Sequence, residues 1–326
     1  MKALRYDAVR SSGPVALEDI AMPVARDGEA LVKVVAAGVN PVDAKIAAGS
    51  FHGPAAARTL GIDFAGTVTA SSRWSAGSRV LGSLAGAGLA RDGAFAEYVT
   101  VEDDALVEMP PALGFDAAAT IGVIGLTAHM AVIGAPASKR DETIVIHGAG
   151  GGVGSACIQI AARVVGARTI AVVSGDEGAV RARSIGAQQT IDRRGADVSK
   201  AVLALTSNRG ADVIIDVVGG AVFESSVTLL APFGRLVAVG LSAGANRRVA
   251  FDLVEFYRTN RRILGVTSST LTGVARAALL RDIVAWIADG TFTPPEPEIM
   301  PLARGVEALA RMMAPDGVHG KVVLRV

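Results

Sequence analysis

The chain has 326 residues, of which 51% are hydrophobic and 19% are charged. This composition excludes intrinsic disorder, because a chain so rich in apolar residues can bury a substantial core. Its 32 basic and 31 acidic side chains nearly cancel, so we expect no nucleic-acid partner. The single cysteine, Cys157, excludes an internal disulfide and a cysteine-rich metal site, and it favours a reducing, cytoplasmic location.

The first ten residues carry charges every few positions, and we therefore predict no signal peptide. Two uncharged runs, 117–138 and 143–162, are long enough to cross a bilayer. Glycines interrupt both runs, and the first also contains His129 and Pro136. We therefore interpret them as buried helices and strands and expect no membrane partner.

The first 120 or so residues contain short alternating strands, at 30–35, 64–69 and 95–101, separated by glycine and proline. This texture is typical of an antiparallel barrel or sandwich. One long predicted helix, 272–289, and a proline-rich linker, 294–301, are followed by a last strand at 321–326, which has the same β-rich pattern as the first part. The pattern predicts a β-rich domain made of two separate parts of the chain.

Between them, short apolar runs alternate with segments of helical spacing, which predicts a parallel sheet covered on both faces. Six such strands match a doubly wound dinucleotide-binding domain. We therefore expect an α/β fold, with this domain inserted into the β-rich one. The predicted strands are 143–147, 168–173, 189–191, 212–217, 235–239 and 263–266, and the helices are 152–165, 177–185, 198–206 and 222–230.

The strongest local signal lies at 144–156, where a hydrophobic strand runs into a cluster of glycines and a helix of small residues follows. A backbone without Cβ atoms can approach a pyrophosphate closely, and the helix N-terminus offers free N–H groups. The spacing G-x-G-x-x-G is met imperfectly, by Ala149, Gly151 and Gly154. Because the loop opens six strand–helix units, we interpret it as a dinucleotide-binding loop rather than a glycine-rich turn without a ligand.

The next strand ends at Ser174 and Gly175, without the acid that would bind the 2′-hydroxyl of NADH. The acids at 176–177 are expected to open the following helix instead. Arg181 and Arg193 lie nearby in the sequence, and a guanidinium can bind a phosphate through two hydrogen bonds. This favours NADPH over NADH; in the alternative interpretation, both arginines are solvated surface charges.

Seven segments carry recognisable motifs: 36–43, 61–66, 93–98, 125–128, the glycine loop, 212–220 and 320–324. Together they resemble the quinone oxidoreductase (zeta-crystallin-like) branch of the zinc-independent medium-chain dehydrogenase/reductases. The resemblance implies a GroES-like catalytic domain in two parts, 1–121 and 267–326, around a Rossmann domain at 122–266. It also implies NADPH-dependent reduction of quinones or α,β-unsaturated carbonyls (enones) by a homodimer.

The resemblance carries site residues with it, and three positions depart from the family pattern. Gly178 stands where many relatives that use NADPH have a phosphate-binding lysine. Arg193 replaces a common Tyr or His and could supply the missing charge, and Lys45 replaces a common Tyr. The implied cofactor residues are Asn40 and Thr127 at the nicotinamide, Gly150, Gly151, Gly152 and Val153 at the pyrophosphate, Ser174 and Gly175 at the ribose, and Val239, Gly240, Leu241, Val266, Thr267 and Ser268 along the cleft.

The resemblance also bears on zinc. Zinc-dependent relatives have Cys at the position of Asn40 and a His-Glu pair at the positions of Ile62 and Asp63. Neither an asparagine nor an isoleucine is a workable zinc ligand. We therefore expect an enzyme without zinc.

Hydride transfer to a quinone or enone leaves an oxyanion that must be stabilised and protonated. Lys45 as an electrostatic partner, Asn40 as a hydrogen-bond donor, or water could do this, and His52 is a further candidate acid. Two alternatives remain: a nucleotide-binding protein with a structural or redox-sensing role and little turnover, and an enzyme resembling alcohol dehydrogenase. The apolar residues expected to line the substrate cleft are Phe51, Ile124, Phe256 and Tyr257.

Overall fold

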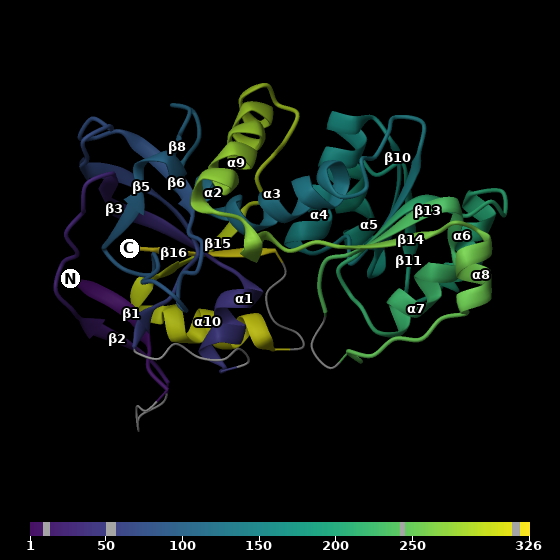
Figure 1. Cartoon of the computed structure of the whole chain (residues 1–326), viewed down its shortest axis with the longest axis horizontal. Helices are drawn as coiled ribbons and strands as arrows, with labels where there is room; N and C mark the ends of the chain where they lie inside the picture. The colour runs from purple at the N-terminus through teal and green to yellow at the C-terminus, as the bar shows by residue number, and fades with distance from the viewer. Residues whose placement is uncertain (9–13, 50–56, 242–244, 315–319) are drawn as a thin grey trace. The chain divides into compact units, whose positions relative to one another are not determined.

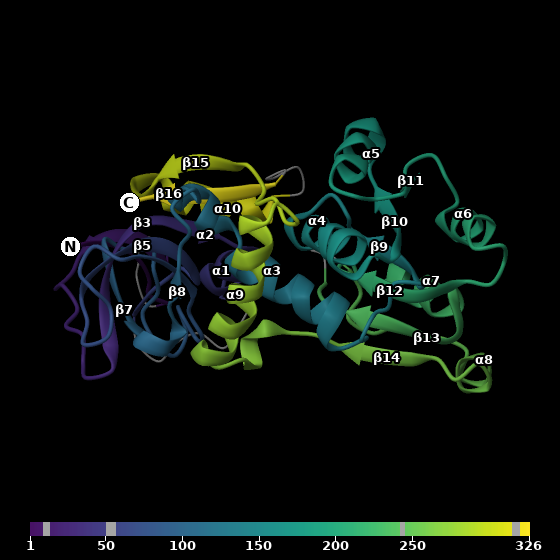
Figure 2. The ribbon, with the colours of Figure 1, turned by 90° about the horizontal axis from the view of Figure 1, so that it is seen from above.

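The computed structural model describes residues 1–8, 14–49, 57–241, 245–314 and 320–326. The chain divides into two compact units, both drawn in Figures 1 and 2. The first unit comprises Met1–Leu126, Ser268–Ala288 and Pro294–Val326. The second comprises Thr127–Thr267 together with the short segment Asp289–Thr293.

The first unit is built on a seven-stranded sheet in which β3 is the long central strand (Figure 1). All its pairings are antiparallel except that of β15 with β16, which is parallel. The strands are β3 (Glu29–Val39), β5 (Asp63–Ala70), β6 (Arg79–Ser83), β7 (Tyr98–Glu102), β8 (Val107–Glu108), β15 (Pro297–Pro301) and β16 (Lys321–Arg325). A smaller sheet pairs β1 (Lys2–Tyr6) with β2 (Val15–Asp19) and β4 (Arg58–Thr59).

The prediction of a linker at 294–301 is wrong, because its second half forms β15. In the described part of the chain β15 pairs with β16 alone, at the edge of the sheet. Proline removes a backbone donor, which an edge strand can tolerate and a central strand cannot. The prolines that suggested a linker therefore mark a sheet edge.

Among the described residues, the α-helices that belong wholly or partly to the first unit are α1 (Pro41–Ala47), α2 (Phe115–Thr120), α3 (Gly122–His129), α9 (Gly273–Ala288) and α10 (Gly305–Met313). Helix α9 lies alongside β8 (Figure 2) and buries Arg276, Ala277, Leu280, Ile283 and Val284, a spacing that places them on one face. Helix α3 crosses the division between the units, since its residues from Thr127 onward belong to the second.

The second unit is a six-stranded parallel sheet in the order β11-β10-β9-β12-β13-β14, with helices around it (Figure 1). This is the doubly wound order, and the predicted fold class is confirmed. The strands are β9 (Thr143–His147), β10 (Arg168–Val173), β11 (Gln189–Asp192), β12 (Ala211–Asp216), β13 (Leu230–Ala238) and β14 (Arg262–Gly265). The helices are α4 (Gly152–Gln159), α5 (Gly175–Ser184), α6 (Val198–Leu205), α7 (Ala221–Thr228) and α8 (Leu253–Arg258).

Strand β13 begins at Leu230, five residues before the predicted start at 235. The earlier start was not predicted because Pro232 and Gly234 are typical turn residues. The backbone is irregular here, since Phe233 has a left-handed φ of 63°. Pairing with β12 continues across this irregularity through a shift of register. No helix in the described segments combines the length and apolar character needed to cross a membrane.

Candidate functional site

The loop after β9 contains glycines that the fold itself requires. Gly148 has a φ of +68°, and a Cβ there would collide with Val217. A Cβ on Gly154 would collide with the carbonyl oxygen of Gly148. These two glycines therefore allow the tight turn from strand to helix, whether or not a ligand binds.

Gly150 and Gly151 differ, because the protein leaves room for side chains at both positions. A Cβ on Gly150 would meet no atom within 4 Å, and one on Gly151 would lie 3.5 Å from the Gly148 oxygen, an ordinary contact. Neither residue has a positive φ, and no side chain caps α4 at Gly151. The space is therefore kept open above the N-terminus of α4, where a pyrophosphate can accept hydrogen bonds from the backbone. The residues present fit a dinucleotide.

The loop lies at the topological switch point, where β9 and β12 are neighbours and the strand order reverses. His147 and Asp216, which end these strands, are paired in register and buried. The Asp216 carboxylate accepts hydrogen bonds from the backbone N–H groups of Val218 (2.7 Å) and Gly219 (3.0 Å). Burial lowers the pKa of His147, which favours a neutral imidazole beneath the loop. The sequence interpretation missed this pair because each residue appeared only as the end of an apolar strand.

The expected ribose site gathers residues from β10, β11 and α5. The Arg193 guanidinium donates a hydrogen bond from Nε to Ser174 Oγ at 2.7 Å. The Asp192 carboxylate accepts from the backbone N–H groups of Gly175 (2.9 Å) and Arg194 (3.1 Å), and these bonds lower its pKa. A Cβ on Gly175 would collide with the Arg194 guanidinium. Ser174 and two arginines thus lie together.

Arg194 is a residue that the sequence interpretation missed. The run Asp192-Arg193-Arg194, directly after a strand, could have indicated it, but only Arg193 is among the predicted phosphate-binding residues. Arg181, which was chosen, lies in the last turn of α5. At a rise of about 1.5 Å per residue, it is about 9 Å along the helix from Gly175. The Arg181 backbone therefore lies more than one helical turn from Ser174.

In the first unit, Asn40 precedes α1 and is 1% exposed. Its amide nitrogen donates to Asp63 Oδ2 at 2.9 Å and to the Gly38 carbonyl at 3.3 Å. Its amide oxygen accepts a hydrogen bond from the Lys321 ammonium. Both amide hydrogens are therefore engaged inside the protein, and Asn40 could donate to a substrate only by giving up one of these bonds.

The same cluster contains a second carboxyl, Asp43, which is 1% exposed. Asp43 Oδ2 accepts from the Asn40 backbone N–H at 2.9 Å, and Asp43 Oδ1 has no hydrogen-bond partner among the described residues. Burial, and next the nearby charge of Asp63, raise the pKa of Asp43 to about 7. The cluster thus holds one ammonium, one carboxylate and a carboxyl that titrates near neutral pH.

The residues at this place do not fit a zinc ion. The Lys321 ammonium is already bound to the Asn40 oxygen and lies 3.6 Å from Asp63 Oδ2. Ile62 is buried and has no ligand atom in its side chain. Among the described residues, no group of three or more His, Cys, Asp or Glu side chains is arranged to hold a metal ion.

The remaining predicted residues are spread over both units. Lys45 is half-buried in the last turn of α1, and Ile124 and Thr127 are buried on α3. Val239 and Gly240 follow the end of β13, and Val266 and Thr267 follow β14. Phe51 and His52 lie outside the described residues.

Phe256 and Tyr257 lie on α8, and the structure places them away from the glycine loop. The Thr259 carbonyl, just after α8, accepts from the N–H of Phe233 near the beginning of β13. The end of α8 therefore lies at the edge where the strands begin, whereas the glycine loop lies where β9 ends. Phe256 packs on the core of this unit and Tyr257 is 59% exposed.

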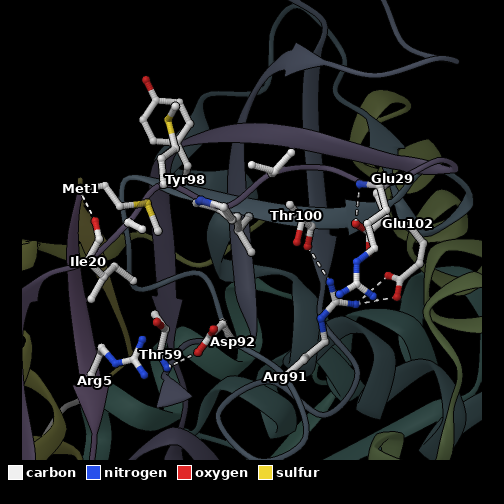
Figure 3. A pocket seen from close by; sticks show the side chains of 17 residues that line it. Met1, Arg5, Ile20, Glu29, Thr59, Arg91, Asp92, Tyr98, Thr100 and Glu102 are labelled. Atoms are coloured by element: carbon white, nitrogen blue, oxygen red, sulfur yellow. Dashed lines mark hydrogen bonds and ion pairs between the residues drawn. The ribbon is translucent and has the colours of Figure 1, made fainter. Parts of the chain in front are cut away.

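A hollow of about 620 Å³ opens in the first unit between β1, β7 and the segment after β2 (Figure 3). Arg91 lies within it and donates to the Glu102 carboxylate at 2.6 and 2.8 Å and to the Thr100 carbonyl at 2.6 Å. None of the predicted site residues lines this hollow. We therefore do not include it in the candidate site.

Two family descriptions match the chain: "Alcohol dehydrogenase GroES-like domain" over residues 26–111 and "Zinc-binding dehydrogenase" over residues 152–285. A quinone oxidoreductase of Pongo abelii is 30% identical over 332 residues, covering 99% of this chain and 97% of the relative. The solved quinone oxidoreductase of Pseudomonas syringae is 26% identical with a TM-score of 0.87, covering 100% of this chain and 99% of that one. A mycobacterial protein solved with NADPH has the same identity and TM-score, 26% and 0.87, with 100% of both chains covered.

A GroES-like unit combined with a doubly wound dinucleotide-binding sheet defines the class of medium-chain dehydrogenase/reductases. Within this class, the full-length match at 30% identity shows that the chain belongs to the quinone oxidoreductase family of oxidoreductases. The resemblance carried by the sequence motifs is thereby confirmed.

Proposed function

We propose that the protein is an NADPH-dependent reductase that transfers a hydride to quinones or α,β-unsaturated carbonyls without zinc. The single observation that carries this proposal is the space above α4 at Gly150 and Gly151, which the fold does not need. At the N-terminus of the first helix of a doubly wound sheet, open glycines let a pyrophosphate approach the backbone N–H groups closely.

The choice of NADPH is supported by the charges around Ser174. Arg193 and Arg194 bring two guanidinium groups to this place, and both can bind a 2′-phosphate. The nearby Asp192 carboxylate accepts the backbone N–H groups of Gly175 and Arg194 at Oδ1, and the Arg194 guanidinium lies 3.5 Å from the same oxygen, so its negative charge is partly balanced beside the expected 2′-phosphate. Gly178 counts against NADPH, because the phosphate-binding lysine common in relatives is absent there, and the two arginines must supply the positive charge instead.

The chemistry divides between the cofactor and the protein. When bound, NADPH supplies the hydride, and reduction of an enone or quinone leaves negative charge on oxygen. The Lys45 ammonium on α1 is our candidate for stabilising this oxygen by its charge. The Asn40 amide has both hydrogens engaged, so we assign it to holding the start of α1 and assign protonation to water.

The absence of zinc chemistry is supported by the ammonium of Lys321. A divalent cation beside Asn40 would face this positive charge at close range, in a buried place where water cannot screen it. Elemental analysis of purified protein should find no stoichiometric zinc, and a chelator should leave turnover unchanged. One zinc ion per chain would overturn this part of the proposal.

A second copy of the chain is the partner we propose for the second unit. Within the described residues β14 is an edge strand that pairs only with β13, and Ile263 on it is 37% exposed. Leu253 and Tyr257 on α8 are 66% and 59% exposed. Unpaired edges with apolar side chains are surfaces for association. Sedimentation velocity should show a dimer, and a monomer at micromolar concentration would refute it.

The decisive experiment is to follow NADPH absorbance with a panel of quinones and enones. We expect oxidation that depends on the acceptor and is faster with NADPH than with NADH. Tight NADPH binding without oxidation by any acceptor would instead support a structural or redox-sensing role. Reduction of NAD⁺ or NADP⁺ by simple alcohols would support an enzyme resembling alcohol dehydrogenase. The buried thiol of Cys157, whose pKa burial raises to about 12, is compatible with work in the reducing cytoplasm.

A further inference from the structure

The interior of the first unit contains a lysine from the last strand, β16. Lys321 is 3% exposed, and burial lowers its pKa while the charges of Asp63 and Asp43 oppose that shift. A buried ammonium is unfavourable unless charged and polar partners compensate for the lost water. Its partners are Asn40 Oδ1, which accepts its hydrogen bond, and Asp63 Oδ2, at 3.6 Å.

Asp63 connects this ammonium to a second helix. Its carboxylate accepts from the Val123 backbone N–H at 2.9 and 3.0 Å, at the first turn of α3. A Cβ on Gly122 would collide with the same carboxylate, so the helix start and the side chain are packed against each other. One carboxylate thus ties α3, Asn40 and Lys321 together.

The consequence for Asn40 is a single allowed orientation. Its amide oxygen faces an ammonium and its amide nitrogen faces the Asp63 carboxylate. Turning the amide by 180° would direct its hydrogens at the ammonium and its oxygen at the carboxylate, both repulsive in a buried place. Asp43 meanwhile accepts from the Asn40 backbone N–H, which holds the main chain at the start of α1.

We infer that Lys321 is a positioning residue for the reaction, whose buried ammonium locks Asn40 and Asp63 and thereby sets the starts of α1 and α3. This inference rests on the proposed function, since α1 carries Lys45 and α3 carries Ile124. An apolar side chain of similar length could fill the space but would leave the Asn40 oxygen and the Asp63 carboxylate without their cation. The charge, rather than the volume, is what the position requires.

The test uses the full chain with Lys321→Ala, which removes the side chain beyond Cβ, and adds propylammonium or the neutral 1-propanol. Lys33→Ala is the matched control, a lysine that is exposed on β3 of the same sheet. Displacing reacting groups by about 1 Å can cost on the order of 10²-fold in rate. We expect Lys321→Ala to lower kcat by about that factor with little change in the NADPH Kd, and propylammonium alone to restore it.

Hydrogen exchange provides a readout that does not depend on turnover. Lys321→Ala should speed amide exchange at the first turns of α1 and α3, and propylammonium should slow it again. If that variant fails to fold, the pair Lys321→Met with Asp63→Asn removes both charges; the inference predicts that it folds and still has a low kcat. Wild-type kcat in either variant, equal rescue by 1-propanol, or unchanged exchange would overturn the inference. A wild-type protein that oxidises no NADPH refutes the proposed function instead. In that case amide hydrogen exchange in Lys321→Ala still tests whether Lys321 holds the first turns of α1 and α3 in place.

Discussion

Replacing Gly151 by valine tests whether this glycine is required for the stability of the fold or for cofactor binding. The new Cβ would lie 3.5 Å from the Gly148 oxygen, an ordinary contact, so the loop should keep its shape. Gly151 is the N-cap of α4 with φ −83° and ψ 171°, which valine can also adopt. The remaining cost is a poorer N-cap, about 1 kcal/mol, or a fall in Tm of about 2–4 °C.

The effect on cofactor affinity should be far larger. The branched side chain would occupy the space that a pyrophosphate needs to reach the N–H groups of α4. Losing two hydrogen bonds to a charged group, at about 1.5–3 kcal/mol each, corresponds to a Kd at least 100-fold weaker. The assay is titration of NADPH fluorescence, with thermal unfolding measured on the same samples.

Gly114→Val is the matched control, because Gly114 is also an N-cap, of α2, with φ −70°, ψ 152° and an open Cβ position. It should lose a similar amount of stability and no NADPH affinity. A Gly151→Val protein that is folded and binds NADPH with wild-type affinity would show that the phosphate site lies elsewhere.

Other perturbations test the ribose end, the candidate ammonium and the buried carboxyl. Ser174→Asp should shift the kcat/KM ratio toward NADH, and Arg194→Ala should weaken NADPH binding alone, by about 10–100-fold; an unchanged ratio in both variants would place the 2′-phosphate site elsewhere. Lys45→Ala should lower kcat about tenfold with the cofactor Kd unchanged, because a partly solvated ammonium is screened; an unaltered single-turnover rate would remove Lys45 from the site. Asp43 ionises at pH 3.8 in its reference state and near 7 in the fold, so stability should fall as pH rises through this window, by up to about 4 kcal/mol. The Tm of Asp43→Asn minus that of wild type should therefore increase from pH 5 to pH 8. A Tm difference that stays constant over this range would contradict the assignment.

Much of the second unit could be predicted from sequence because its strands are buried on both faces. Such strands appear as continuous apolar runs, and β9 and β10 have the predicted ends. The prediction failed where a local signal conflicted with pairing. Pro232 and Gly234 suggested a turn inside β13, and the prolines of β15 suggested a linker. Pairing with a neighbouring strand overrode the local preference in both cases.

The candidate site was predicted less completely, because its chemistry depends on residues distant in the sequence. The glycine loop is a local motif, and its position between a strand and a helix was predicted from the sequence. The cluster around Asn40 joins residues 23 and 281 positions away, Asp63 and Lys321, and no spacing rule connects them. Each of the two belongs to a segment that carries the family resemblance, yet the segments contain no sign that their side chains meet.

The cluster also offers a physical account of how this place can be ordered without zinc, as we propose. The Asp63 carboxylate is 0% exposed, and a carboxylate so deeply buried needs a positive partner inside the protein. In this chain that partner is the ammonium of Lys321, which is part of strand β16 and therefore fixed to the sheet. Such a cation cannot exchange or act as a Lewis acid, but it holds its charge in one place at the start of two helices. In the reaction that we propose, the cofactor donates the hydride, and the protein contributes the positions of the reacting groups and the charges around them.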